Sequence, residues 1–87
     1  MMGTSQAFKF LLPSEKKFIQ ITINKPMKLE DLKYYFEKVL GYRFFGIELM
    51  YYLDGKKVED SLTLFDVRDM VNPPKEIIEL TVELNFD

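Results

Sequence analysis

The sequence predicts an α+β fold in which a mixed β-sheet carries one helix packed across one face. Two observations lead to this prediction. Apolar and polar residues alternate before residue 24 and after residue 46, as in half-buried strands, whereas residues 29–40 follow a helical period. The predicted order is two strands, a helix, a third strand, a very short fourth strand and a last strand, or ββαβ(β)β. A chain of 87 residues accommodates these elements in one domain.

The first two predicted strands form a hairpin. Phe8, Phe10 and Leu12 alternate with Lys9 and Leu11, and Pro13 opens a polar turn that runs to Lys17. Two strands separated by about five turn residues are typical of a β-hairpin. The second strand is identified by its alternating β-branched residues, Ile19, Ile21 and Ile23.

The helix is predicted over Leu29–Leu40, with Gly41 as the residue that ends it. No side chain suited to an N-cap precedes it, since Lys28 occupies that position. We expect Leu32, Phe36 and Val39 to be its central core contacts. The whole apolar stripe comprises Leu29, Leu32, Tyr35, Phe36, Val39 and Leu40. Of the two following aromatic residues, Phe44 and Phe45, we expect one to be buried.

The third strand places Ile47, Leu49, Tyr51 and Leu53 on the core side. Asp54-Gly55 then predicts a tight hairpin turn that leads into a very short strand at Val58. A short helical turn follows at Thr63–Val67, with Thr63 and Asp66 as its capping residues and Leu64 and Val67 inward. The last strand presents one apolar face, made by Ile78, Leu80, Val82, Leu84 and Phe86. We expect residues 1–7 to form a flexible lead-in and residues 8–87 to form the domain.

Composition argues against catalysis and cofactor binding. The chain has no His and no Cys, so a Ser-His triad on Ser14 or Ser61 and a thiolate metal site are excluded. The acidic pairs Glu59-Asp60 and Asp66…Asp69 lie in predicted loops without a deep cleft. We therefore expect no enzyme activity, no metal and no cofactor. The longest apolar runs are only a few residues, too short for a membrane-spanning helix.

The segment "DGKKVEDSLTLFDV", residues 54–67, resembles the corresponding segment of ubiquitin. "LEDLK", residues 29–33, resembles the start of the ubiquitin helix. The resemblance extends roughly from Phe8 to Phe86 and implies the ubiquitin-like β-grasp roll. The identical positions are Gly55, Lys56, Glu59, Asp60, Thr63, Leu64 and Asp66.

Two narrower resemblances leave the subfamily open. "IELMYYLDGKKVEDSLTLFDV" is similar to the RAWUL domain of Polycomb RING-finger proteins, and "FFGIELMYYLDGKKVED" is similar to the N-terminal domain of clustered-mitochondria-type proteins. Conjugated ubiquitin-like proteins end in a flexible Gly-Gly tail, whereas this sequence ends Glu83-Leu84-Asn85-Phe86-Asp87. We expect a non-conjugated domain, part of a larger protein, located in the cytoplasm or the nucleus.

Strand phase predicts a protein-binding site on the sheet face that the helix leaves uncovered. If Tyr51 points inward, Met50 and Tyr52 point outward together, with Leu11 as a neighbour. An apolar centre with a charged rim is typical of an interface. The predicted rim consists of Glu48, Glu79 and Glu83. We expect an adaptor domain that binds a protein partner of unknown identity through this face.

Two alternatives come from other classes. Lys16, Lys17, Lys25 and Lys28 provide a basic patch for nucleic acid or an acidic partner. A net charge of −2, with 12 basic and 14 acidic residues, makes nucleic-acid binding the weaker option. The other alternative is a structural module that forms a homodimer by edge pairing of its last strand.

Overall fold

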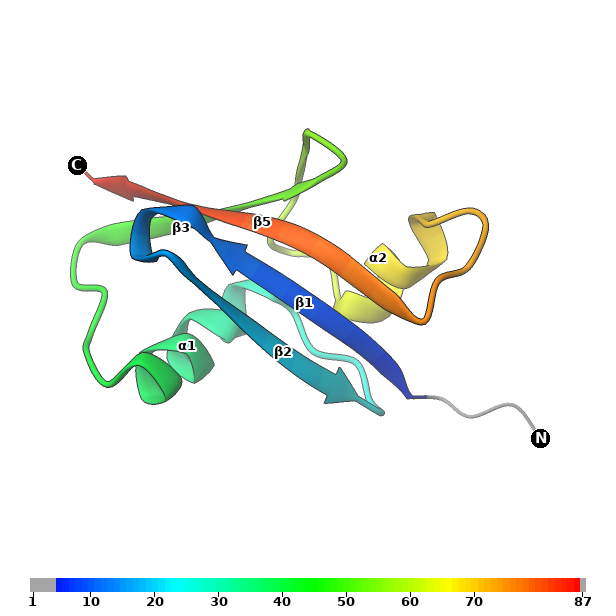
Figure 1. The fold of residues 1–87 in the computed structure, drawn as a ribbon, viewed down its shortest axis with the longest axis horizontal. Coiled ribbons are helices and arrows are strands. Elements are labelled where there is room, and N and C mark those ends of the chain that lie inside the picture. Colours follow the sequence, from blue (N-terminus) through cyan, green and yellow to red (C-terminus); the bar gives the residue numbers. More distant parts are fainter. Residues whose placement is uncertain (1–4, 87) are drawn as a thin grey trace.

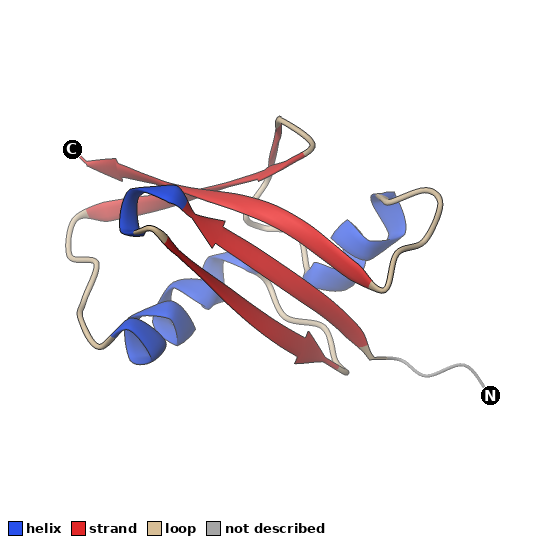
Figure 2. Ribbon diagram, in the orientation of Figure 1, coloured by secondary structure: helices blue, strands red, loops and turns tan. Residues whose placement is uncertain are grey.

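The computed structural model describes residues 5–86 and has the predicted α+β architecture. One mixed sheet has five strands in the order β2-β1-β5-β3-β4. Figures 1 and 2 show α1 and α2 on the same side of this sheet, behind β1, β2 and β5 in that view. The elements are β1 (Gln6–Leu12), η1 (Pro13–Glu15), β2 (Lys17–Ile23), η2 (Leu29–Asp31), α1 (Leu32–Leu40), β3 (Ile47–Leu53), β4 (Lys56–Val58), α2 (Leu64–Met70) and β5 (Ile77–Phe86).

The last strand in the sequence is the central strand of the sheet. β5 runs parallel to β1 on one side and antiparallel to β3 on the other. The two hairpins, β1 with β2 and β3 with β4, therefore join only through β5. The turn between β3 and β4 has positive φ at Asp54 (52°) and Gly55 (82°), as a type I′ hairpin turn requires.

The core lies between this sheet and the two helices. Phe10 of β1 is fully buried, and its ring meets Phe36 of α1 edge-on at a centroid distance of 5.2 Å. Tyr51 of β3 meets the same Phe10 ring at 6.5 Å. Leu64 and Val67 of α2 are also fully buried, as predicted. The strand phases expected for the first, third and last strands are confirmed by the burial of alternate residues, except that Phe86, at the end of the last strand, is 67% exposed.

The helix differs from the prediction in its phase. Leu32 and Phe36 are fully buried, but Val39 is 50% exposed and Tyr35 is 39% exposed, so assigning Val39 to the central core was wrong. The first turn, Leu29–Asp31, is a 3₁₀-helix, and only Leu32–Leu40 is α-helical. At 100° per residue, Leu32, Phe36 and Leu40 span a narrow arc, and Val39 and Tyr35 lie progressively farther round the helix.

The start of the helical segment is held by backbone rather than by a capping side chain. Neither η2 nor α1 has a side-chain cap. Instead, the Leu29 N–H donates to the Leu62 carbonyl at 3.0 Å and the Glu30 N–H donates to the Asp60 carbonyl at 3.0 Å. These bonds satisfy donors that a helix start leaves open, which explains the missing N-cap residue. At the other end, Gly41 has a φ of 83° and closes α1 as predicted.

The predicted capping residues Thr63 and Asp66 form a reciprocal capping box at the start of α2. The Asp66 N–H donates to Thr63 Oγ1 at 3.1 Å, and the Thr63 N–H donates to Asp66 Oδ2 at 2.9 Å. The helix continues to Met70, three residues beyond the predicted turn. The capping box nucleates a helix that is longer than its short apolar pattern indicates.

The first strand begins earlier than expected. Gln6 and Ala7 already pair with Ile23 and Thr22 of β2, so these two residues belong to the sheet rather than to a lead-in. The Gln6 side-chain amide also donates to the backbone carbonyls of Lys75 and Glu76. Residues 1–4 of the predicted lead-in, and Asp87, lie outside the described residues.

Replacing Leu32 by Ala is expected to lower the free energy of unfolding by about 2–5 kcal/mol, because a fully buried leucine leaves a cavity against the sheet. Val39→Ala, on the same helix but half exposed, is the matched control and is expected to cost about 1 kcal/mol or less. Urea denaturation measures both. Equal losses for the two variants would contradict the helix orientation described above.

A pH dependence is expected from the capping box. The hydrogen bond from the Thr63 N–H, together with the Thr63 side chain, lowers the pKa of Asp66. Its contribution to stability is therefore complete above the ordinary pKa of Asp and is lost as the pH falls through the lowered, folded-state value. Urea midpoints measured across the acid range are expected to fall more in the wild type than in Asp66→Asn. Parallel curves for the two proteins would rule out this contribution.

Candidate functional site

The sheet register brings the predicted binding residues together. On the face opposite the helices, Tyr52 of β3 pairs with Thr81 of β5, and Thr81 pairs with Leu11 of β1. Leu11 in turn pairs with Phe18 of β2. A single row of side chains therefore crosses four strands. Met50 lies two residues before Tyr52 in β3, on the same face of the sheet, and pairs with Glu83 of β5. We call Leu11, Phe18, Met50 and Tyr52 the outer apolar patch.

The outer apolar patch is partly covered by its own neighbours. Leu11, Met50 and Tyr52 are half-buried, whereas Phe18 is 58% exposed. The Tyr52 hydroxyl lies 4.0 Å from the Met50 sulfur, so these two side chains contact each other. Side chains that are already partly packed lose less rotamer freedom on binding, which lowers the entropic cost of contact with a partner.

The rim of the patch carries both signs of charge. Glu83 is beside Met50, and Glu48 accepts a weak hydrogen bond from the Asn85 amide at 3.5 Å. Glu79, however, pairs with Lys9, and Tyr52 pairs with Lys57. The predicted rim of Glu48, Glu79 and Glu83 is thus acidic near Met50 and mixed elsewhere.

Phe18 is the patch residue that sequence reasoning missed. The Lys9 ammonium lies over its ring, with Nζ 4.5 Å from the centroid, a cation–π arrangement that holds both side chains on the outer face. The signal was present in the sequence. Because Ile19, Ile21 and Ile23 face the core, Phe18 must face outward.

The alternative sites are not assembled as predicted. Lys16 and Lys17 lie at one end of β2, while Lys25 and Lys28 follow its other end, so a strand of seven residues separates the pairs by about 20 Å. The predicted homodimer through edge pairing of the last strand is wrong, because β5 is the central strand of the sheet and has a neighbour on each side.

Of the two predicted acidic pairs, Asp66…Asp69 has structural partners for both carboxylates. Asp66 belongs to the capping box, and Asp69 accepts from Arg68 at 3.2 Å. Within residues 5–86, no three side chains of the kinds that bind metals gather closely enough to hold an ion. In the same part of the chain, no helix is long and apolar enough to cross a bilayer.

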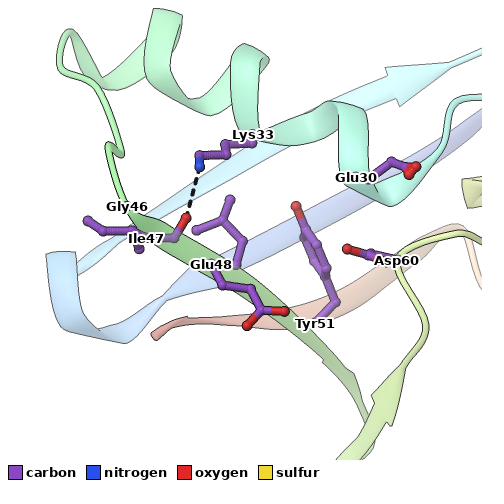
Figure 3. Close-up of a pocket in the computed structure, with 8 residues that line it drawn as sticks. Glu30, Lys33, Gly46, Ile47, Glu48, Tyr51 and Asp60 are labelled. Carbon is purple, nitrogen blue, oxygen red and sulfur yellow. Dashed lines mark hydrogen bonds between the residues drawn. The ribbon is translucent and has the colours of Figure 1, made fainter. Parts of the chain in front are cut away.

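A concave surface, separate from the outer apolar patch, lies at the edge of β3 on the helix side of the sheet. Its hollow has a volume of about 430 Å³. Figure 3 shows the Tyr51 ring rising from β3 with its hydroxyl end toward the helical segment that carries Glu30 and Lys33. We call this the edge hollow. Its lining residues are Glu30, Lys33, Gly46, Ile47, Glu48, Leu49, Tyr51 and Asp60.

Tyr51 is the unusual group in the edge hollow. The residue is 1% exposed, and its hydroxyl has no hydrogen-bond partner within residues 5–86. Burial, and secondly the negative charge of Asp60, raise the pKa of Tyr51, so the side chain is a neutral phenol at all ordinary pH values. An unpaired buried hydroxyl is costly to a fold.

The similarity of this chain to known proteins lies in its architecture and not in its sequence. No protein-family model and no curated protein matches the sequence. Among solved structures, the chain is similar to the EccD5 ubiquitin-like domain from Mycobacterium xenopi, with a TM-score of 0.61 at 15% identity over 95% of this chain and 97% of that one. The fold is ubiquitin-like.

A designed protein based on ubiquitin supports the same conclusion. It aligns with a TM-score of 0.56 at 17% identity, over 94% of this chain and 88% of the design. The feature shared with both structures is therefore the arrangement of the strands and the helix.

Replacing Tyr51 by Phe is expected to leave the free energy of unfolding unchanged or to raise it by about 1 kcal/mol, because the change removes an unpaired buried hydroxyl and keeps the ring in the core. Urea denaturation measures the difference. Tyr52→Phe, on the outer face, serves as the control for loss of a half-buried hydroxyl. A loss of stability in Tyr51→Phe well above that control would show that the hydroxyl has a structural partner.

Proposed function

We propose that this ubiquitin-like domain is a non-conjugated protein–protein interaction module, an adaptor within a larger protein of the cytoplasm or nucleus. It binds its partner non-covalently through the outer face of the sheet. One observation carries the proposal, namely the outer apolar patch, whose side chains from β1, β2 and β3 lie on the face opposite α1 and α2. The proposal contains no catalytic step and no cofactor.

The composition of the patch favours protein binding. Tyr52 and Phe18 supply large, stiff contact areas, and Met50 adapts to a partner's shape. Charged residues surround this centre, in the arrangement of an apolar core with a polar rim. Tyrosine is among the residues that most often dominate binding energy, so Tyr52 is the expected main contributor.

The charges of the rim favour a partner with a basic segment. Glu48 and Glu83 flank Met50, and their charges have no cationic cross-strand neighbour, whereas Glu79 is paired with Lys9. A basic segment placed over the Met50 end therefore gains the most from electrostatic complementarity. The proposal includes kinship with RAWUL-type or clustered-mitochondria-type domains, both of which are domains of larger proteins.

The test is affinity capture with the wild type and with the Met50→Ala/Tyr52→Ala variant. The double variant is expected to lose the specific partner, because it removes the centre of the patch. The matched control is Tyr34→Ala/Phe45→Ala, which truncates two side chains that are 71% and 80% exposed on the helix and the following loop. Urea denaturation of all three proteins establishes that each is folded.

The two variants separate the proposed surface from its rivals. Loss of the partner in Met50→Ala/Tyr52→Ala alone supports the outer face. Retention in that variant with loss in Tyr34→Ala/Phe45→Ala moves the site to the helix surface and overturns the proposal. Retention of all partners in both variants also overturns it, and an exposed strand edge then becomes the better hypothesis.

A further inference from the structure

The edge hollow lies where β3 lacks a neighbour. β4 pairs only with Tyr51–Leu53, whereas the preceding residues Ile47–Met50 pair with β5 alone. The outer edge of β3 is therefore open along this stretch. An open edge presents unpaired backbone donors and acceptors, which a further strand can engage. This edge is distinct from the outer apolar patch, so the inference stands independently of the proposed function.

The backbone of the open edge is oriented to accept a strand. The Ile47 carbonyl accepts a hydrogen bond from the Lys33 ammonium at 2.9 Å, so this carbonyl points away from β5. Backbone groups alternate in direction along an antiparallel strand. The N–H and carbonyl of Leu49, two residues later, therefore point the same way, toward the edge hollow.

The side chains of the hollow favour a cation. Three carboxylates, those of Glu30, Glu48 and Asp60, line it, and Lys33 is the one cationic residue among the lining residues. The Lys33 ammonium is already engaged by the Ile47 carbonyl. Figure 3 shows the Asp60 carboxylate directed toward Tyr51, Glu30 on the neighbouring helical segment, and Glu48 projecting from the strand apart from them.

The buried hydroxyl is an independent indication of a ligand. Tyr51 is 1% exposed, lines the hollow, and offers an oxygen with no partner within residues 5–86. As a neutral phenol, it can accept a hydrogen bond from an ammonium while donating to a nearby carboxylate. A charge-assisted bond to a buried group is stronger than one between neutral groups.

We propose that the open edge of β3 binds an extended segment of a partner protein, and that a lysine side chain of this segment enters the edge hollow. There its ammonium meets Glu30, Asp60 and the Tyr51 hydroxyl. The segment adds as a strand beside Ile47–Met50 and uses the Leu49 backbone groups. Lys33 holds the Ile47 carbonyl in the free protein and releases it when the strand is added.

The test uses a blocked peptide of sequence threonine-valine-lysine-valine-threonine, whose β-branched residues favour an extended chain. Its counterpart carries ε-acetyl-lysine, which keeps the length and removes the charge. Each is titrated into ¹⁵N-labelled protein, and binding is followed from the amide resonances. Saturable shifts are expected at Leu49 and Asp60. The acetylated peptide is expected to bind about tenfold more weakly.

Two charge-matched variants locate the site. Glu30→Gln/Asp60→Asn is expected to weaken binding of the lysine peptide by about tenfold. Glu79→Gln/Glu83→Gln removes the same charge from the outer face and is expected to leave binding within about twofold, because screened surface charges contribute little. Lys33→Met, which frees the Ile47 carbonyl and removes the competing cation, is expected to strengthen binding.

Four outcomes overturn the inference. These are no saturable binding at millimolar peptide, equal binding of the acetylated peptide, equal weakening by the two charge-matched variants, and shifts centred on Tyr52 and Glu83. The last result assigns the peptide to the outer apolar patch and so supports the proposed function while refuting the edge site. Loss of a protein partner in Met50→Ala/Tyr52→Ala does not bear on the edge hollow, so the two proposals fail separately.

Discussion

The contact between Phe10 and Phe36 is the interaction on which the rest of the structure depends. Phe10 lies on the strand between β2 and β5, and its ring receives Phe36 from the helix and Tyr51 from the opposite hairpin. A domain of this size buries only about 60% of the surface its unfolded chain exposes, so a few large side chains must supply most of the burial. These three rings fix the distance of the helix from the sheet and the relation between the two hairpins.

The central position of β5 and the short length of β4 together explain why both candidate surfaces exist. By pairing with β1 and β3, β5 places Leu11 and Tyr52 on either side of Thr81 and so joins the parts of the outer apolar patch that come from the two hairpins. The same arrangement leaves β3 with a single partner along Ile47–Met50, because β4 is only three residues long. β5 therefore gathers the outer apolar patch, and the short length of β4 sets where the open edge of β3 begins.

The two surfaces differ in what they offer a partner. The outer apolar patch presents side chains that are ordered and mostly apolar, which suits contact with a folded or helical surface. The edge hollow presents backbone groups, carboxylates and a buried phenol, which suits an extended chain with a cation. Tyr51 and Tyr52 are adjacent in the sequence yet serve opposite faces, because successive side chains of a strand point in opposite directions.

The sequence by itself determined the strands, the hairpin turn at Asp54-Gly55, the capping box and the outward phase of Met50 and Tyr52, because each is a local pattern of period or turn chemistry. Only the tertiary structure decided the rest. Val39 is half exposed because the helix is oriented with Phe36 packed against Phe10. The apolar stripe of the helix is wide enough to allow more than one orientation on the sheet. Strand pairing between residues far apart in the chain places Leu11, Thr81 and Tyr52 in one row and leaves the edge of β3 open. No local sequence pattern specifies this pairing. The unpaired Tyr51 hydroxyl likewise follows from packing, since alternation predicts that the ring is inward but not what surrounds its oxygen.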